Sequence, residues 1–334
     1  MRKSLIAAMA GAGVLSIALA TLPLAQADPT GPPTYRKLAG VGSDTTQTLM
    51  NSLADIVTVG GEKVIGSYDA IGSPTITTKD PVANPKCKDI TRPKGSSGGR
   101  DALLKSLQAN DGCLQFARSS SSRGTWTSTP SMTWIPFATD ALTFAVRADG
   151  DVPRELTKAQ LIAIYKCELP AYQPALVQVE SGTRSSWLSY VGITEADIAA
   201  GKYPCLVPVK DGGTFPGEYP QEHDGRSLKK NWVMAYSAAV YQAQIYGTAP
   251  DRRGRAVIGV IDGITPTVIN TGFGNLRDVN NVIPTAKVTD TTSLEYQVFV
   301  GKDSLICKAK PSINLQGFGD LKDASKCGDT SSRS

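Results

Sequence analysis

The sequence predicts an α/β protein with two lobes. Short apolar strands repeatedly pass through a turn rich in Ser, Thr and Gly into a segment with helical spacing. Hydrophobic residues make up 41% of the 334 residues, beside 32 Gly and 21 Pro, which is typical of a globular chain with many turns. A chain of this length can bury the cores of two lobes.

The first strand-turn-helix unit lies near the start of the globular part. Residues 38–43 read as a short buried strand that reaches a turn, and residues 45–57 have helical apolar spacing. The turn at 92–100 leads into a helix over 101–108, and the turn at 177–186 opens a helix over 187–191. Each unit places backbone N–H groups and hydroxyls at a helix N-terminus, where the helix dipole favours an anion.

The remaining pattern completes both lobes. Residues 113–120 predict a short strand that ends in hydroxyls, and residues 135–147 predict a longer strand pair that crosses between the lobes. Residues 156–165 begin with a Thr cap and continue as an amphipathic helix.

The C-terminal third is predicted less regularly. Residues 231–245 predict a helix, and the continuous apolar run at 256–261 predicts a strand that is buried on both faces and returns the chain toward the first lobe. Residues 208–226, rich in Gly, Pro and charge, predict a loop, and the polar tail at 329–334 is expected to be mobile.

The N-terminus has the pattern of a secretory signal peptide. Arg2 and Lys3 precede an apolar run, and Ala25-Gln26-Ala27 matches a cleavage site. We expect residues 1–27 to be removed after Ala27 and the mature chain to be released. The signal region contains no Cys, so no lipid anchor is expected there.

The six cysteines all lie in the mature part, and an even number in an exported chain predicts three disulfides. Sequence alone permits 15 pairings. We favour the neighbouring pairs, since each closes a modest loop: Cys87–Cys113, Cys167–Cys205 and Cys307–Cys327. No metal site and no cofactor are expected, because there is no CxxC motif and His223, in a loop where solvent exposure is expected, is the only histidine.

The charge balance and the absence of enzyme motifs narrow the function classes. Formal net charge is +5, and removal of the signal leaves 33 basic against 30 acidic residues, which is too balanced to imply nucleic acid. No Walker loop or HExxH motif is present, so an enzyme is not expected.

Five motifs in order resemble the phosphate-binding proteins of ABC phosphate uptake systems. They are Gly42-Ser43-Asp44-Thr45-Thr46-Gln47, Gly95-Ser96-Ser97-Gly98-Gly99, Phe116-Ala117-Arg118-Ser119-Ser120, the helix from Leu156 to Tyr165, and Ser181-Gly182-Thr183. The resemblance covers roughly residues 38–261 and implies a type II periplasmic-binding-protein fold, in which two α/β lobes joined by crossover strands close around an oxyanion. We divide the chain accordingly into a first lobe at 28–140, a second lobe at 141–255 and a return to the first lobe at 256–334.

The same resemblance implies that turn amides and hydroxyls hold the ligand. The implied ligand-binding set is Ser43, Asp44, Thr45, Thr46, Ser96, Ser97, Arg118, Ser119, Ser120, Ser181, Gly182, Thr183 and Arg184. Two positions depart from the family pattern: Ser120 replaces the expected Asp, and Val177 replaces the expected Arg. Asp44 is the candidate replacement for the acid, and Arg184 or Arg118 for the arginine.

The implied function is reversible binding of inorganic phosphate or a related oxyanion outside the membrane by a monomeric solute-binding protein, with an ABC permease as its partner. The alternative is a secreted interaction or scavenging protein that keeps the fold without transport. Nucleic acid is not an expected partner of either.

Overall fold

The structure is a computed structural model that describes residues 28–29, 31–206, 212–214, 218–270 and 272–334. The predicted signal peptide lies outside the described residues. Among the residues that are described, no helix is both long and apolar enough to cross a membrane.

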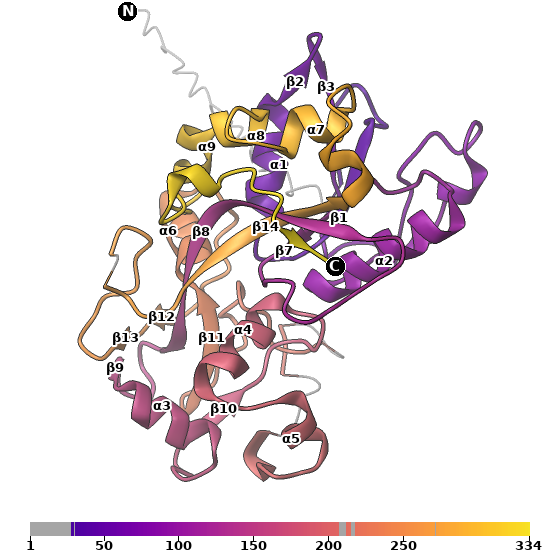
Figure 1. Ribbon diagram of the computed structural model, residues 1–334. Coiled ribbons are helices and arrows are strands. Elements are labelled where there is room, and N and C mark those ends of the chain that lie inside the picture. Colours follow the sequence, from indigo (N-terminus) through magenta and orange to yellow (C-terminus); the bar gives the residue numbers. More distant parts are fainter. Residues whose placement is uncertain (1–27, 30, 207–211, 215–217, 271) are drawn as a thin grey trace, which may run out of the picture.

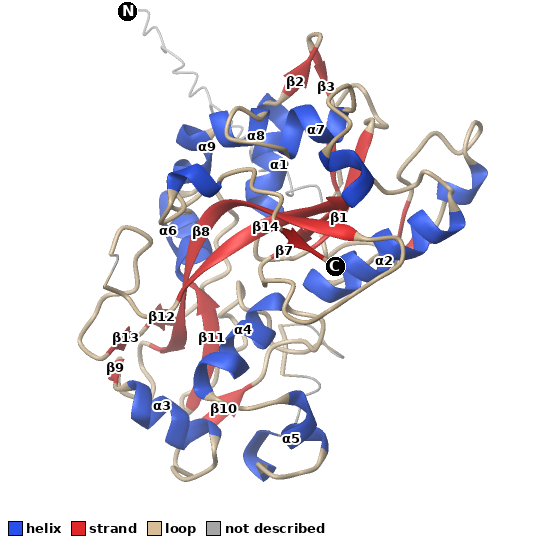
Figure 2. Ribbon diagram, viewed as in Figure 1, coloured by secondary structure: helices blue, strands red, loops and turns tan. Residues whose placement is uncertain are grey.

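A nine-stranded sheet runs through both lobes in the order β10-β11-β8-β14-β7-β1-β4, and β12 and β15 also pair with β8 (Figure 2). Its strands are β1 (Leu38–Gly42), β4 (Ile65–Ser67), β7 (Phe116–Ser119), β8 (Met132–Arg147), β10 (Gln173–Ala175), β11 (Trp232–Ser237), β12 (Ala256–Ile258), β14 (Leu276–Pro284) and β15 (Ser332–Arg333). Two-residue strands form three small pairs: β2 (Thr58–Val59) with β3 (Glu62–Lys63), β5 (Thr75–Ile76) with β6 (Ile90–Thr91), and β9 (Glu155–Leu156) with β13 (Val260–Ile261).

Helices cover this sheet in both lobes (Figure 1). The α-helices are α1 (Gln47–Ile56), α2 (Gly95–Ala109), α3 (Lys158–Tyr165), α4 (Gly182–Val191), α5 (Glu195–Ala199), α6 (Ala238–Tyr246), α7 (Leu294–Phe299), α8 (Leu305–Lys308) and α9 (Lys310–Leu315). Short 3₁₀ turns lie at Pro85–Cys87, Pro204–Leu206, Thr285–Val288 and Ala324–Lys326.

Each lobe has its own apolar core. In the first lobe Phe116 of β7 packs on Phe299 of α7, with ring centroids 5.0 Å apart, among buried side chains of α1 and β4. In the second lobe Trp187 of α4 packs against Tyr165 of α3, with ring centroids 5.9 Å apart. The observed architecture is therefore the predicted α/β arrangement of two lobes.

The strand β8 joins the two lobes. Its first part pairs with β14 from Met132 to Ala141, and its second part pairs with β11 and β12 from Leu142 to Arg147. The prediction of two strands over 135–147 was wrong, because one 16-residue strand crosses the boundary. The prediction that this segment crosses between the lobes is confirmed.

Two other element predictions were wrong. The predicted helix at 231–245 is the strand β11 followed by α6, whose first turn is capped by Ser237. All six residues of β11 are buried, so apolar and polar residues do not alternate along it. Without that alternation the sequence pattern does not distinguish a strand from a helix. The C-terminal tail at 329–334, which was expected to be mobile, contains the strand β15, and β15 pairs with β8.

The apolar run at 256–261 also differs from its prediction. Gly259 lies between β12 and β13, and a side chain there would overlap the ring of Phe144. Val257 and Ile258 are half-buried instead of fully buried. These strands pair with β8 and β9 in the second lobe, and β14 is the strand that carries the chain back beside β7.

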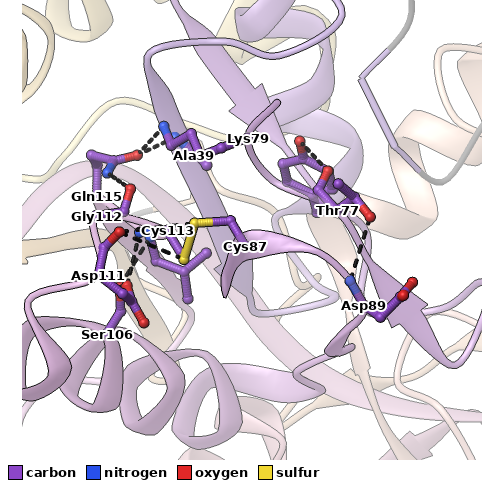
Figure 3. Close-up of a disulfide and its surroundings, with 12 residues drawn as sticks. Ala39, Thr77, Lys79, Cys87, Asp89, Ser106, Asp111, Gly112, Cys113 and Gln115 are labelled. Atoms are coloured by element: carbon purple, nitrogen blue, oxygen red, sulfur yellow. Dashed lines mark hydrogen bonds between the residues drawn. A yellow bond between two sulfur atoms is a disulfide. The ribbon is translucent and has the colours of Figure 1, made fainter. Parts of the chain in front are cut away.

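The three predicted disulfides are present: Cys87–Cys113, Cys167–Cys205 and Cys307–Cys327. Figure 3 shows the first, which ties the 3₁₀ turn at 85–87 to the segment between α2 and β7. Beside it, Gln115 Oε1 accepts hydrogen bonds from the Ala39 amide and from Lys79 Nζ at 2.9 and 2.7 Å. Three disulfides suit a protein of an oxidising, extracytoplasmic compartment.

Candidate functional site

Hydroxyls from three segments of the first lobe meet between the lobes. Ser43 follows β1, Ser96 lies in the first turn of α2, and Ser120 follows β7. Ser43 Oγ donates to Ser120 Oγ at 3.1 Å, and the Ser120 amide donates to Ser96 Oγ at 3.0 Å. All three side chains are buried.

The second lobe adds hydroxyls from the start of α4. Ser181 caps this helix by accepting hydrogen bonds from the Thr183 and Arg184 amides at 3.0 and 3.3 Å. Thr183 Oγ1 lies 3.1 Å from Thr45 Oγ1 of the first lobe. We call Ser43, Thr45, Ser96, Ser120, Ser181 and Thr183 the hydroxyl cluster.

Gly182 allows the two lobes to approach this closely. A Cβ atom at this position would lie 2.4 Å from Ser96 Oγ and 2.6 Å from Ser120 Oγ. The backbone of α4 therefore lies directly against hydroxyls of the first lobe, and a side chain at this position would displace them.

The arginine beside the hydroxyl cluster is Arg277 of β14, which the sequence-based prediction missed. Its Nε and Nη2 atoms donate to Asp140 Oδ2 at 3.1 and 2.7 Å, and Nη2 also donates to Thr183 Oγ1 at 2.8 Å. Its Nη1 atom is buried without a hydrogen-bond partner. Arg277 thus brings a fixed positive charge and a free donor to the cluster.

Asp140 holds this arginine from the crossover strand β8. The carboxylate is fully buried and also accepts hydrogen bonds from Ser237 Oγ and the Ala239 amide at 2.8 and 3.2 Å. One sequence signal pointed to it: a lone carboxylate within the apolar run 135–147 needs a buried partner. That signal does not identify Arg277, which lies 137 residues away.

Neither arginine of the predicted ligand set serves the cluster. All five N–H donors of Arg118 are engaged, by Ser67 Oγ and by the carbonyls of Gly40, Gly42, Ser43 and Tyr68. Arg184 binds both oxygens of Glu195 at 2.7 and 2.8 Å and the Val177 carbonyl at 3.0 Å. Both side chains are buried and organise the backbone around them.

Three further residues of the predicted ligand-binding set, two serines and one threonine, are not part of the hydroxyl cluster. Ser97 Oγ donates to the Glu180 carbonyl at 3.2 Å, and Ser119 Oγ donates to the Ser121 carbonyl at 2.8 Å. Thr46 is fully buried at the N-terminus of α1, and its Oγ1 has no hydrogen-bond partner.

A second buried group, which we call the acid–histidine cluster, consists of Asp44, Glu222 and His223. Glu222 Oε1 accepts hydrogen bonds from Ser181 Oγ at 2.7 Å and Thr45 Oγ1 at 3.0 Å, so it joins both lobes. Asp44 Oδ2 accepts from Gln178 Nε2 at 3.0 Å and lies 3.6 Å from His223 Nδ1.

Burial controls the protonation of these three groups. Burial, reinforced by the nearby Glu222 carboxylate, raises the pKa of Asp44 well above its usual value. Burial also disfavours the charged form of Glu222, but His223 and hydrogen bonds from Asp44 and Ser181 outweigh it and lower the pKa of Glu222. Burial lowers the pKa of His223. The pKa values of Asp44 and Glu222 are thus shifted in opposite directions.

The expectation that His223 is exposed to solvent was wrong, since only 3% of it is accessible. A turn closed by the bridge between Gln221 and Asp224 folds inward, and Gln244 Nε2 donates to the His223 carbonyl at 2.7 Å. The loop composition that suggested exposure reflects the surrounding residues and not the inward turn itself.

Hollows adjoin the site on two sides. One of about 290 Å³ is lined by Asp44, Thr45 and His223, together with Asp69 and Arg252. A wider one of about 690 Å³ is lined by Ser96, Ser181 and Gly182 among others. Residues of both clusters therefore line hollows at the site.

Comparison with known proteins supports the fold. No protein-family model matches the chain, and no curated protein matches it by sequence. Among solved structures, a DING protein is 12% identical with a TM-score of 0.51, and the match covers 86% of this chain and 92% of that one. A human phosphate-binding apolipoprotein is also 12% identical, with a TM-score of 0.50 and the same coverage.

A third neighbour comes from Clostridium perfringens and is assigned as the substrate-binding protein of a phosphate ABC transporter, with phosphate bound. It is 13% identical with a TM-score of 0.50, over 85% of this chain and 99% of that one. The chain thus has the two-lobed fold of periplasmic binding proteins, as its motifs predicted.

Proposed function

We propose that this chain is an extracellular solute-binding protein that reversibly binds phosphate or a similar tetrahedral oxyanion for ABC-type uptake. The supporting observation is the free Nη1 donor of Arg277 beside the hydroxyl cluster. A buried donor without a partner costs about 1–3 kcal/mol. An anion oxygen would satisfy this donor and take hydrogen bonds from the neighbouring hydroxyls.

Helix dipoles support the same ligand class. The helices α1, α2 and α4 begin beside Thr45, Ser96 and Thr183, and α1 and α2 have no side-chain cap on their first N–H groups. Helix N-termini favour negative charge. The carboxylate of Glu222 can accept a hydrogen bond from the P–OH group of hydrogen phosphate, which gives a reason for preferring this anion to fully ionised sulfate.

Isothermal titration with phosphate, sulfate, arsenate and molybdate tests the proposal on protein stripped of ligand. We expect heat of binding with phosphate and arsenate, and weaker or no heat with sulfate. Absence of heat with all four anions on a folded sample would exclude this function.

The variant Arg277→Gln tests the assigned donor. Removing one partner of a buried charged contact costs about 2–5 kcal/mol, so we expect phosphate affinity to fall by more than about tenfold. Arg277→Lys keeps the charge but not the planar fork, and we expect an intermediate affinity. Arg255→Gln is the control, because it removes an equal charge from an exposed pair with Asp149. Equal affinities in Arg277→Gln and the control would refute the role of Arg277.

Transport is separable from binding. A pull-down of permease subunits from cells grown without phosphate distinguishes an uptake receptor from a secreted scavenging protein of the same fold. Recovery of a permease favours uptake, whereas phosphate binding without any permease favours scavenging.

A further inference from the structure

We propose that Asp44, Glu222 and His223 form a binding site for a divalent transition-metal ion of the zinc class. Each residue offers one ligand atom, and the three atoms lie within 4.8 Å of one another. The three residues are 2%, 0% and 3% accessible, so the group is a buried constellation and not a patch of surface acids.

Unpartnered atoms point to a missing binding partner. Both ring nitrogens of His223 and Oε2 of Glu222 are buried without a hydrogen bond. Native proteins rarely leave several buried polar atoms unpaired within one group, because each costs about 1–3 kcal/mol. A metal ion would bind one imidazole nitrogen and the free carboxylate oxygen at the same time.

The donor set selects the ion. One imidazole and two carboxylates suit zinc and its neighbours, whereas magnesium and calcium prefer oxygen ligands alone. Hydrogen bonds already orient both carboxylates. Ser181 and Thr45 donate to Glu222 Oε1, the Thr45 amide donates to Asp44 Oδ1 at 3.1 Å, and Gln178 donates to Asp44 Oδ2, which keeps a second lone pair for an ion. Such outer contacts orient ligands toward a metal.

The surrounding charges leave the cation a net favourable field. Arg226 is paired with Asp224, and Arg277 is paired with Asp140. Arg252 lines the adjoining hollow and opposes a cation, and binding of a metal displaces any proton from Asp44, so that both carboxylates face the ion. Asp44 and His223 line that hollow, which gives an ion a route from solvent.

The inference does not rest on anion binding, and the test uses metal alone. Protein treated with a chelator is titrated with zinc chloride in phosphate-free buffer and followed by calorimetry, and magnesium and calcium are titrated in parallel. We expect one zinc ion per chain and no magnesium or calcium binding at comparable concentrations. Phosphate titration of the same stripped protein reports separately on the proposed function.

Variants locate the ion. Glu222→Gln and His223→Gln keep the approximate size of each side chain, and we expect zinc affinity to fall at least about tenfold in each. Asp69→Asn is the matched control, because Asp69 lines the same hollow without belonging to the cluster, and its zinc affinity should equal that of the unaltered protein.

Three outcomes would overturn the site: no zinc binding by the unaltered protein, unchanged affinity in His223→Gln, or an equal loss in Asp69→Asn. If a variant does not fold, cobalt substitution of the unaltered protein decides the question. The intense visible absorption of tetrahedral cobalt supports the site, and its absence counts against it.

Discussion

Two buried arginines show how residue function depends on unused bonding capacity. Arg118 lies within a motif that resembles a ligand site, yet carbonyls and Ser67 engage all of its donors. Arg277 lies outside every predicted motif but keeps a free buried Nη1. Only the second can change partners when a ligand arrives without leaving backbone carbonyls unpaired.

The adjacent residues Thr183 and Arg184 give a direct comparison. Thr183→Val removes the hydroxyl that contacts Thr45 and Arg277, and we expect phosphate affinity to fall about tenfold through loss of about 1.5 kcal/mol. Arg184→Gln breaks the contact with Glu195 and should reduce the free energy of unfolding while leaving affinity nearly unchanged. Calorimetry and urea unfolding of both variants provide the measurement. A larger loss of phosphate affinity in Arg184→Gln than in Thr183→Val would show that Arg184 contributes to ligand binding.

The residues of the candidate site were predictable to different degrees. Ser43, Ser96 and Ser181 follow local rules, since each lies in a polar turn that leads into a helix. Arg277, Glu222 and His223 depend on long-range contacts, such as the one between Glu222 and Thr45 across 177 residues. No local pattern marks such pairs, so their roles required the folded chain.

Asp69 gives a pH dependence that can be isolated. Burial outweighs the charge of Arg118 and the hydrogen bond from Asn51, and raises the pKa of Asp69 to about 6. The unfolded chain releases this proton near pH ~3.9. Between these values the folded protein holds a proton that the unfolded chain lacks, so the free energy of unfolding falls as the pH rises.

Asp69→Asn should remove this contribution. The amide oxygen can still accept from Asn51 Nδ2, which lies 2.8 Å from Asp69 Oδ1. We expect the variant to lose at most about 3 kcal/mol of pH dependence between pH ~4 and ~6. Urea unfolding at several pH values measures how the free energy of unfolding depends on pH in the unaltered protein and in the variant. Identical slopes in the two proteins would show that Asp69 does not retain its proton in the folded state.

At the scale of elements, helix starts were easier to predict than strand identity. Thr157 forms a capping box with Gln160, as the Thr-first pattern indicated, and α3 begins at the next residue. The start of α6 was predicted wrongly because the buried strand β11 before it is apolar on both faces and lacks the alternation that marks a strand. The helix begins only after Ser237, which caps it. Caps are local chemistry, whereas burial on two faces is set by the neighbouring strands.

The capping box at Thr157 sets the stability of α3. Thr157 accepts from the Gln160 amide at 3.1 Å, and Gln160 Oε1 accepts from the Thr157 amide at 2.8 Å. Thr157→Ala removes the first bond and should lower the free energy of unfolding by about 1 kcal/mol. Thr157→Ser keeps the hydroxyl and should restore most of it. Urea unfolding measures both, and equal losses would mean that the cap does not contribute.

At the scale of the whole molecule, β8 and β14 form the connection about which the lobes are arranged. Contacts across the site join the lobes: Thr45 with Thr183 and Glu222, Asp44 with Gln178, and Ser97 with Glu180. Every one of these contacts is polar. A polar boundary favours reversible separation, because water can replace its hydrogen bonds when the lobes part.

Gly182 permits a test of this closure. A methyl group at Gly182 would meet Ser96 Oγ and Ser120 Oγ of the other lobe at 2.4 and 2.6 Å, so Gly182→Ala should hold the lobes apart while α4 itself remains helical. We expect a larger radius of gyration by small-angle X-ray scattering, and phosphate should no longer compact the variant. Gly274→Ala is the control, because a Cβ atom there meets no atom within 4 Å. If Gly182→Ala compacts with phosphate as the control does, the lobes do not need this close approach to bind their ligand.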